Sequence, residues 1–419
     1  MNAVAGIAAA PHPVQIGADV DSADLVTSVA REVVCAVVRR FKPQLRALVL
    51  TGSMARQEAT FVKVSGGWAA LGDCESLLVF EPHEALPDST QVADLQQEIE
   101  LRLKQLGMAC PIGLSAVHPR YLGNLQPHIY GYELRTCGHV VWGDAGILAL
   151  IPPFEPCAIP REDAWRMLCN RMIEQLAATG EGHQPEDALP TPAGYKTIKL
   201  CLDLATSLLL FCDEYAPTYQ ARCARLQRLA EKLPAMEDLP FPLQPFAALV
   251  EKATHWKLFP APRARDAAPS LRPRVWDYAR RLWRWELLRL TGAPEELSNA
   301  CLVRCWMRFQ PLPQRLRGWA SLARRQGWLA SWRDWPHWAH LGVQGSPRHW
   351  IYMAGGELFF RLPSLRDEGG ETCPHHDLQT WRKWLPVQPE RAADKKYSWR
   401  QLASEIGWNY RRFLMETSS

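Results

Sequence analysis

Short apolar runs alternate with helical patterns over residues 23–142, and this alternation most constrains the fold of the chain. Residues 23–42 and 91–107 place apolar side chains at helical spacing, and the second segment ends at Gly107. The runs RALVLTG, ESLLVFE and PIGLSAVH predict strands, and HIYGYELRTCGHVVW predicts a helix end followed by a strand. Strands that alternate with helices predict a small α/β domain with a mixed sheet.

The chain changes character after Arg161, where helical patterns replace the strand-like runs. We expect helices at 161–180, 194–214, 217–233, 275–291 and 396–415, with proline-rich breaks at 239–245 and 260–274. Residues 342–375 are expected to be irregular, with a possible hairpin at HWIYMAGGELFFRL, and ATFVKVSGGWAALG is expected to be a loop with a Gly-Gly turn.

These patterns predict three folded regions after a flexible tail at 1–20. The predicted regions are an α/β core at 21–158, an all-α domain at 159–258 and a basic, Trp-rich, mainly helical region at 259–419. Charge supports a division, because residues 1–160 carry 11 Lys+Arg and 16 Asp+Glu, a net of −5, within a chain of net charge +4. The basic remainder could favour an anionic partner.

Composition narrows the class of protein. No apolar run approaches the roughly 20 residues that a membrane span needs, and the N-terminus lacks the pattern of a signal peptide. The 12 cysteines include no CxxC pair and are expected to be reduced thiols. We therefore expect a cytoplasmic protein without a membrane span. The sequence also contains no GxSxG, Walker, HExxH or GxGxxG motif in its required context.

One pair of segments suggests chemistry. The run LVLTGSMARQE stops a strand at Gly52-Ser53, and the next strand opens with Asp73 and Glu75. Because strand residues two apart point to one face, the two carboxylates should lie side by side, where they repel unless a cation separates them. Mg²⁺ is usually held by one or two carboxylates together with substrate phosphates. A Gly-Ser turn beside them offers backbone N–H groups to a phosphate.

This arrangement resembles the DNA polymerase beta-like nucleotidyltransferase superfamily, whose signature is Gly-Ser at a strand end followed by D-x-D or D-x-E on the next strand. Within it, the chain looks most like bacterial small-substrate nucleotidyltransferases that carry a helical C-terminal domain. The resemblance covers about residues 45–150, and extends more loosely to about 235. It implies transfer of a nucleoside monophosphate from an NTP, with ATP the expected donor, to an unidentified hydroxyl acceptor, with release of pyrophosphate.

The resemblance implies roles for individual residues. Asp73 and Glu75 would be catalytic and would hold Mg²⁺, and Gly52 and Ser53 would bind the nucleotide phosphates. Further candidates for nucleotide binding are Arg56, Lys196 and Lys199. The alternative without a function is that these are ordinary solvated or ion-paired side chains on helices.

The sequence departs from the family pattern in two places. Nineteen residues separate Ser53 from Asp73, which an inserted loop would explain. The third carboxylate usual in the family is missing from PIGLSAV, and His118 or Glu133 would have to replace it. The alternative is therefore a catalytically weakened nucleotide-binding or interaction protein on the same fold.

A third hypothesis concerns the region rich in Trp and Arg. Fifteen of the 18 tryptophans lie at or after residue 256. Basic and aromatic residues together can bind RNA by charge and stacking. Ordinary packing of tryptophan, with arginine outside, is the favoured explanation of this composition, and nucleic acid is the less favoured partner.

Overall fold

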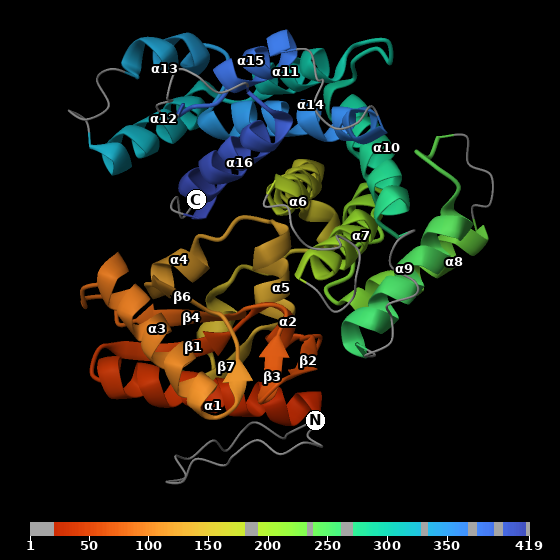
Figure 1. Ribbon diagram of the computed structural model, residues 1–419. Coiled ribbons are helices and arrows are strands. Elements are labelled where there is room, and N and C mark those ends of the chain that lie inside the picture. The colour runs from red at the N-terminus through yellow and green to blue at the C-terminus, as the bar shows by residue number, and fades with distance from the viewer. Residues whose placement is uncertain are drawn as a thin grey trace. The chain divides into compact units, whose positions relative to one another are not determined.

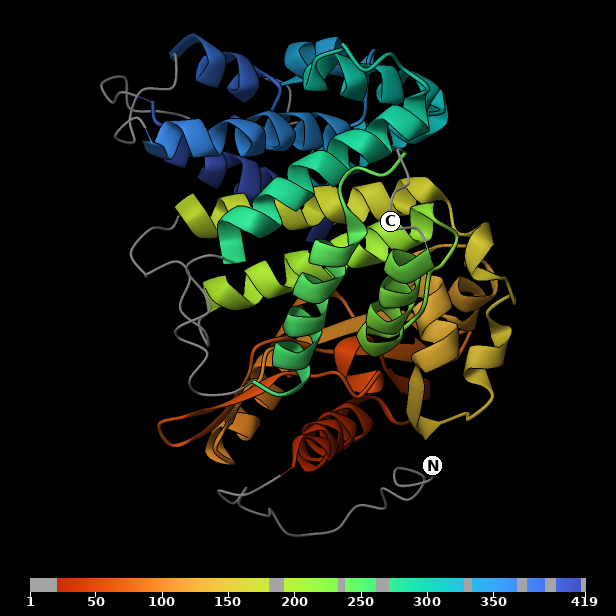
Figure 2. The ribbon, with the colours of Figure 1, turned by 90° about the vertical axis from the view of Figure 1, so that its right-hand side faces the viewer.

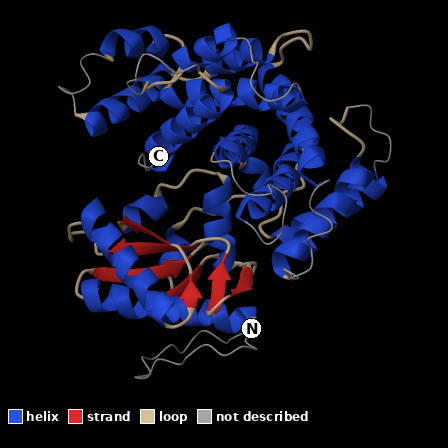
Figure 3. Ribbon diagram, viewed as in Figure 1, coloured by secondary structure: helices blue, strands red, loops and turns tan. Residues whose placement is uncertain are grey.

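The computed structural model describes residues 21–180, 192–232, 238–260, 271–327, 334–367, 375–388 and 397–415, so the predicted tail lies outside the described residues. The chain forms two compact units and passes between them more than once. The first unit takes its residues from Met1–Asp163, Cys212–Leu233 and Leu243–Asp266, and the second from Ala164–Phe211, Pro234–Pro242 and Ala267–Ser419. Within the described ranges, every strand belongs to the first unit (Figure 3).

A four-stranded sheet organises the first unit. Its strands are β1 (Leu45–Leu50), β4 (Cys74–Phe80), β6 (Ile112–Val117) and β7 (His139–Gly143). The order is β6-β4-β1-β7, with β4 and β6 parallel and the other two pairs antiparallel. A mixed sheet built from the predicted strands is therefore confirmed.

Both faces of this sheet are covered, which explains why its central strands are almost continuously apolar. Leu48 and Leu50 of β1 join one core cluster under the helices α1 (Ser22–Phe41) and α3 (Ser89–Gln105) (Figure 1). The alternate residues of β1 enter a second cluster, which includes residues of α4 (Pro119–Gly123), α5 (Ile129–Cys137) and the short 3-10 helix Ile147–Leu150. A second 3-10 helix spans Pro156–Ala158.

The segment expected to be a loop is a β-hairpin, so that prediction was wrong. The strands β2 (Phe61–Val64) and β3 (Gly67–Ala70) pair in antiparallel orientation. On its other side, β3 pairs in parallel orientation with β5 (Met108–Ala109). Gly66 and Gly67 have φ angles of +90° and +150°, so the Gly-Gly pair forms the tight turn of the hairpin. The backbone of Gly67 also lies directly against Gly107, where a side chain would not fit.

Two later helices complete the first unit. The helices α8 (Tyr219–Lys232) and α9 (Leu243–Leu258) pack on each other. Hydrogen bonds tie them to the core, since Thr60 Oγ1 donates to the carbonyl of Lys257 at 2.8 Å. The observed units thus differ from the predicted division at 158 and 258, because α8 and α9 pack with the strands while the helices before them pack with the C-terminal part.

The second unit is entirely helical in its described part. Its helices are α6 (Arg161–Gly180), α7 (Pro192–Phe211), α10 (Leu271–Thr291), α11 (Asn299–Phe309), α12 (Leu312–Gln326), α13 (Trp335–Gly342), α14 (Pro347–Asp367), α15 (His375–Lys383) and α16 (Trp399–Tyr410), followed by a π-helical turn at Arg411–Met415. The helices α6 and α7 run side by side (Figure 2), joined by an ion pair of 2.5 Å between Arg171 and Asp203. No helix in the described ranges is both long and apolar enough to cross a membrane.

The predicted hairpin within 342–375 was also wrong, because its residues lie in the helix α14. Its two glycines do not form a turn. A Cβ at Gly355 would be 2.8 Å from Ile173 Cγ1, and one at Gly356 would be 3.1 Å from Trp283. The glycines therefore let α14 lie close to α6 and α10, which no local pattern in the sequence indicates.

Tryptophan fills the core of this unit. The fully buried Trp165 lies 4.5 Å from Trp306 and 5.8 Å from Trp283, measured between ring centroids. Several arginines stack on the outer rings, as Arg289 does on Trp285 at 3.9 Å. Most of the tryptophans at or after residue 256 are buried, as expected for packing residues. Their rings are therefore not accessible to the bases of a nucleic acid.

Candidate functional site

The Gly-Ser turn lies against the strand that carries the acidic pair. The short helix α2 (Gly52–Ala55) follows β1, and Gly52 has a φ angle of +64°, which favours glycine. The amide of Thr51 donates to the carbonyl of Glu75 at 2.9 Å, which fixes the turn beside β4. Among the described residues, the amide N–H groups of Gly52 and Ser53 have no hydrogen-bond partner.

Asp73 and Glu75 are exposed, and both lie over one glycine of the neighbouring strand. Glu75 pairs with Gly113 in the parallel β4–β6 ladder. A Cβ built at Gly113 would be 3.8 Å from Glu75 Cγ and 3.9 Å from Asp73 Oδ2. The same construction at Gly52 would overlap Glu75 Oε2. The structure therefore brings Gly52, Asp73 and Glu75 to one edge of the sheet.

Burial and the negative charges of Asp73 and Glu75 raise the pKa of neighbouring side chains. The thiol of Cys74 lies between the two acids in sequence and is buried; burial raises its pKa to about 12, and the charges of Asp73 and Glu75 add to that effect. Tyr130 of α5 is 37% exposed. Burial raises the pKa of the Tyr130 hydroxyl above its ordinary range, and the nearby Tyr121 and Glu75 raise it further. Tyr130 is thus an aromatic neighbour of Glu75 that the sequence did not indicate.

Asp73 and Glu75 could offer two carboxylate ligands to a metal ion. No group of three His, Cys, Asp or Glu side chains in the described ranges is arranged to hold a metal ion. Two carboxylates, both close to Gly113, are as many protein ligands as commonly hold Mg²⁺ together with a nucleotide. The remaining ligands would be phosphate oxygens and water.

The position that faces the acidic pair from β6 is Gly113, so β6 supplies no third carboxylate there. The two candidates to replace it are otherwise engaged. His118 Nε2 lies 2.9 Å from the carbonyl oxygen of Glu84. Glu133 accepts hydrogen bonds on both oxygens, at 2.5 Å from Arg56 and 2.7 Å from Tyr215. Both oxygens of Glu133 and the Nε2 atom of His118 are thus engaged by protein groups.

Glu133 is the centre of a buried ionic cluster behind the Gly-Ser turn. Arg222 of α8 also donates to Glu133, and Arg56 Nε lies 3.2 Å from Glu58. The Arg56 side chain is 8% exposed and that of Arg222 is 3% exposed. Burial acts to lower the pKa of Arg56, but the charge of Glu133 raises it, and the net result lies above its ordinary value. The cluster therefore joins α2, α5 and α8 with charged groups that balance one another.

Aromatic rings enclose the cluster. The guanidinium carbon of Arg56 lies 5.4 Å from the centroid of the Tyr219 ring, and that of Arg222 lies 5.1 Å from it. Gln220 donates its amide N–H to Glu58 at 3.1 Å. These contacts place Arg56 in the packing of the first unit. Its predicted role in nucleotide binding stays a prediction, and its observed partners are protein groups.

The remaining candidates belong to the second unit. Lys196 and Lys199 are half-buried on α7, and Lys199 Nζ lies 5.9 Å from the centroid of the Tyr195 ring. The edge formed by Gly52, Ser53, Asp73 and Glu75 is built from the first unit alone. The predicted contact of the two lysines with nucleotide stays a prediction.

Comparison of the chain with protein-family models, with curated proteins and with solved structures found no match. The functional argument therefore depends on the geometry of the site.

Proposed function

We propose that the first unit is a nucleotidyltransferase-like core and that it binds a nucleoside triphosphate together with Mg²⁺, with ATP the expected nucleotide. The observation that carries the proposal is the convergence of Gly52, Asp73 and Glu75 at one edge of the sheet. Both carboxylates are exposed, so the site is open to a ligand.

Each group has a defined task in this proposal. The amide N–H groups of Gly52 and Ser53 would donate to phosphate oxygens, because they have no partner among the described residues. Asp73 and Glu75 would hold Mg²⁺, which neutralises phosphate charge when bound. The partly exposed ring of Tyr130, beside Glu75, offers a surface for the nucleoside.

Calorimetric titration of ATP into the full chain, with and without Mg²⁺, tests the proposal. We expect binding that requires Mg²⁺ and that Asp73→Ala abolishes. Asp94→Ala is the matched control, since Asp94 is an exposed carboxylate on α3, outside the site. Equal affinity of the Asp73→Ala protein and the wild type would refute the site assignment. Absence of binding by all four common nucleoside triphosphates would refute the function.

Nucleotidyl transfer to a hydroxyl acceptor is the second candidate function. The exposed acidic pair favours it, because charge stabilisation and positioning supply most of the catalysis in phosphoryl transfer. Gly113 opposes it, because a carboxylate that could activate the acceptor is missing from β6. Release of pyrophosphate from ATP in the presence of hydroxylated acceptors would distinguish transfer from binding alone. If Mg²⁺-dependent binding occurs without pyrophosphate release for any acceptor tried, the weakened core is the better description.

A further inference from the structure

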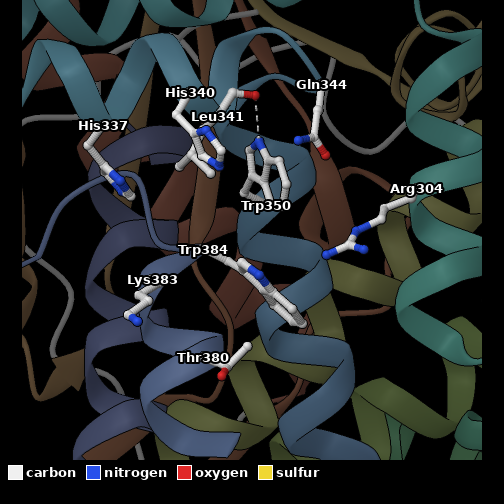
Figure 4. A pocket seen from close by; sticks show the side chains of 9 residues that line it. All are labelled: Arg304, His337, His340, Leu341, Gln344, Trp350, Thr380, Lys383 and Trp384. Atoms are coloured by element: carbon white, nitrogen blue, oxygen red, sulfur yellow. Dashed lines mark hydrogen bonds between the residues drawn. The ribbon is translucent and has the colours of Figure 1, made fainter.

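A cavity of about 310 Å³ lies within the second unit, between the helices α11, α13, α14 and α15 (Figure 4). Its volume is in the range of sites that take small organic molecules. None of its lining residues carries a negative charge, whereas Arg304 and Lys383 carry positive charges and His340 adds an imidazole. The composition of the wall therefore favours an anion.

The two fixed positive charges are available. Arg304 and Lys383 are exposed, and neither forms an ion pair or side-chain hydrogen bond within the part of the chain that the structure describes. Figure 4 shows the guanidinium of Arg304 reaching toward the ring of Trp384 from one side, with His337 and His340 on the other. Guanidinium groups favour carboxylate and phosphate, because their N–H groups match two oxygens at once.

Trp384 is more exposed than Trp350, the other tryptophan that lines the cavity. Trp350, which also lines the cavity, is 2% exposed, and its indole N–H donates to the carbonyl of Leu341 at 3.0 Å. Trp384 is only half-buried and packs on no other aromatic ring among the described residues. Trp384 is thus a partly exposed aromatic side chain in the wall of the cavity, on which a flat ring could stack.

The wall is held in place by hydrogen bonds, one of which uses the lining residue His337. His337 Nε2 lies 3.0 Å from the carbonyl oxygen of Leu385, and the indole N–H of Trp338 donates to Pro386 at 2.7 Å. These bonds tie α13 to the residues just after Trp384. A pre-formed wall reduces the entropy that binding would cost.

We propose that this cavity binds a small organic oxyanion that carries a flat ring, with the phosphate or carboxylate group on Arg304 and the ring on Trp384. Lys383 adds positive charge, and His340, Gln344 and Thr380 offer hydrogen bonds to the rest of the ligand. The cavity lies wholly within the second unit, so the inference does not depend on the nucleotide site of the first unit.

Calorimetry with the full chain tests the inference, using phenyl phosphate and benzoate as probes. Binding of either one supports it, and their relative affinity decides between phosphate and carboxylate. We expect Arg304→Gln to weaken binding roughly tenfold or more, as loss of a charge-assisted hydrogen bond should. Arg308→Gln is the matched control, because it removes the same charge from an exposed position of α11 outside the cavity, and it should leave affinity unchanged.

Further arms test the ring. Inorganic phosphate lacks a ring and should bind more weakly than phenyl phosphate, and Trp384→Leu should remove that difference. Circular dichroism of the Trp384→Leu protein would check that it folds. Failure of both ring-bearing probes to bind, or equal losses in Arg304→Gln and Arg308→Gln, would overturn the inference. Inorganic phosphate binding as tightly as phenyl phosphate would overturn the assignment of the ring to Trp384.

Discussion

The carboxylate of Glu75 lies against the backbone of Gly52, so closely that a Cβ on Gly52 would overlap its Oε2 atom. Gly52 also has a φ angle of +64°. The residue is therefore constrained twice, once by its own backbone and once by the carboxylate beside it.

The first prediction uses this double constraint. Gly292 has almost the same φ, +62°, but a Cβ there would meet nothing within 4 Å. Gly292→Ala should lower the free energy of unfolding by about 1–2 kcal/mol, the cost of the left-handed conformation alone. Gly52→Ala should lower the free energy of unfolding, measured by chemical denaturation, by more than Gly292→Ala does, because Glu75 must also move. The same substitution should weaken Mg²⁺-dependent nucleotide binding. If the two substitutions cost the same, Glu75 is not held against Gly52.

The second prediction concerns the missing third carboxylate. Gly113→Asp would place a carboxylate between Asp73 and Glu75, since a Cβ there makes only ordinary contacts with both. A third carboxylate beside Asp73 and Glu75 should raise the affinity of the protein for Mg²⁺ by roughly tenfold or more over the wild type, as measured by calorimetry. Ser115→Asp is the control, because Ser115 lies on the same strand but pairs with Leu77 instead. Equal gains in both variants would mean that added charge acts through the general field of the protein and not at the site.

The third prediction concerns the buried ionic cluster. Glu133→Gln would leave the buried guanidinium groups of Arg56 and Arg222 without their shared carboxylate. Removal of one partner from a buried pair costs about 3–5 kcal/mol, which urea denaturation would detect. Glu98→Gln at the exposed pair with Arg39 is the control and should cost less than about 1 kcal/mol. A small loss in Glu133→Gln would mean that water reaches the cluster.

The fourth prediction concerns pH. Glu286 of α10 is fully buried, and neither of its carboxylate oxygens has a hydrogen-bond partner among the described residues. Burial raises the pKa of the Glu286 carboxyl well above its ordinary value. The nearby Ser207 hydroxyl lowers this pKa, but by less than burial raises it. The unfolded chain loses this proton near pH 4.3, but the folded chain keeps it to higher pH. Stability should therefore fall as pH rises between the two pKa values, by about 1.4 kcal/mol per pH unit.

Glu286→Gln should remove this dependence, because glutamine does not titrate. Denaturation series at several pH values from 4 to 9 would show the variant gaining on the wild type as pH increases. Glu296→Gln, at an exposed position of the same unit, should keep the wild-type slope. Parallel curves for the wild type and Glu286→Gln would show that the Glu286 carboxyl ionises at its ordinary pH in the folded chain.

The sequence predicted those parts of the fold that depend on local patterns. The strands around Leu48 and Leu78 were recognisable because burial on both faces makes them continuously apolar. The hairpin at Gly66 was missed because its two glycines resemble a loop. The helix through Gly355 was mistaken for a hairpin because a glycine that permits close helix packing looks the same as one that makes a turn.

The candidate site was predictable only where it follows from strand alternation. The spacing of Asp73 and Glu75 put both carboxylates on one face, which the structure bears out through their shared neighbour Gly113. The position of Tyr130 beside Glu75 depends on how α5 packs at the sheet edge, and no local pattern encodes it. Of the partners of Arg56, Glu58 is only two positions away in the sequence, but Glu133 is 77 positions away and no local pattern indicates it.

The alternation of the chain between its two units has a consequence for synthesis. The first unit needs α8 and α9, which follow α6 and α7 of the second unit in sequence. A ribosome therefore delivers the sheet early, but the helices that hold Arg222 against Glu133 emerge only after two helices that belong elsewhere. A fragment ending near residue 163 would expose the sheet-side half of the ionic cluster to water. Neither unit is one continuous stretch of the chain, so a single truncation isolates neither. To produce the first unit alone, its separate segments would have to be joined by linkers that replace the segments of the second unit.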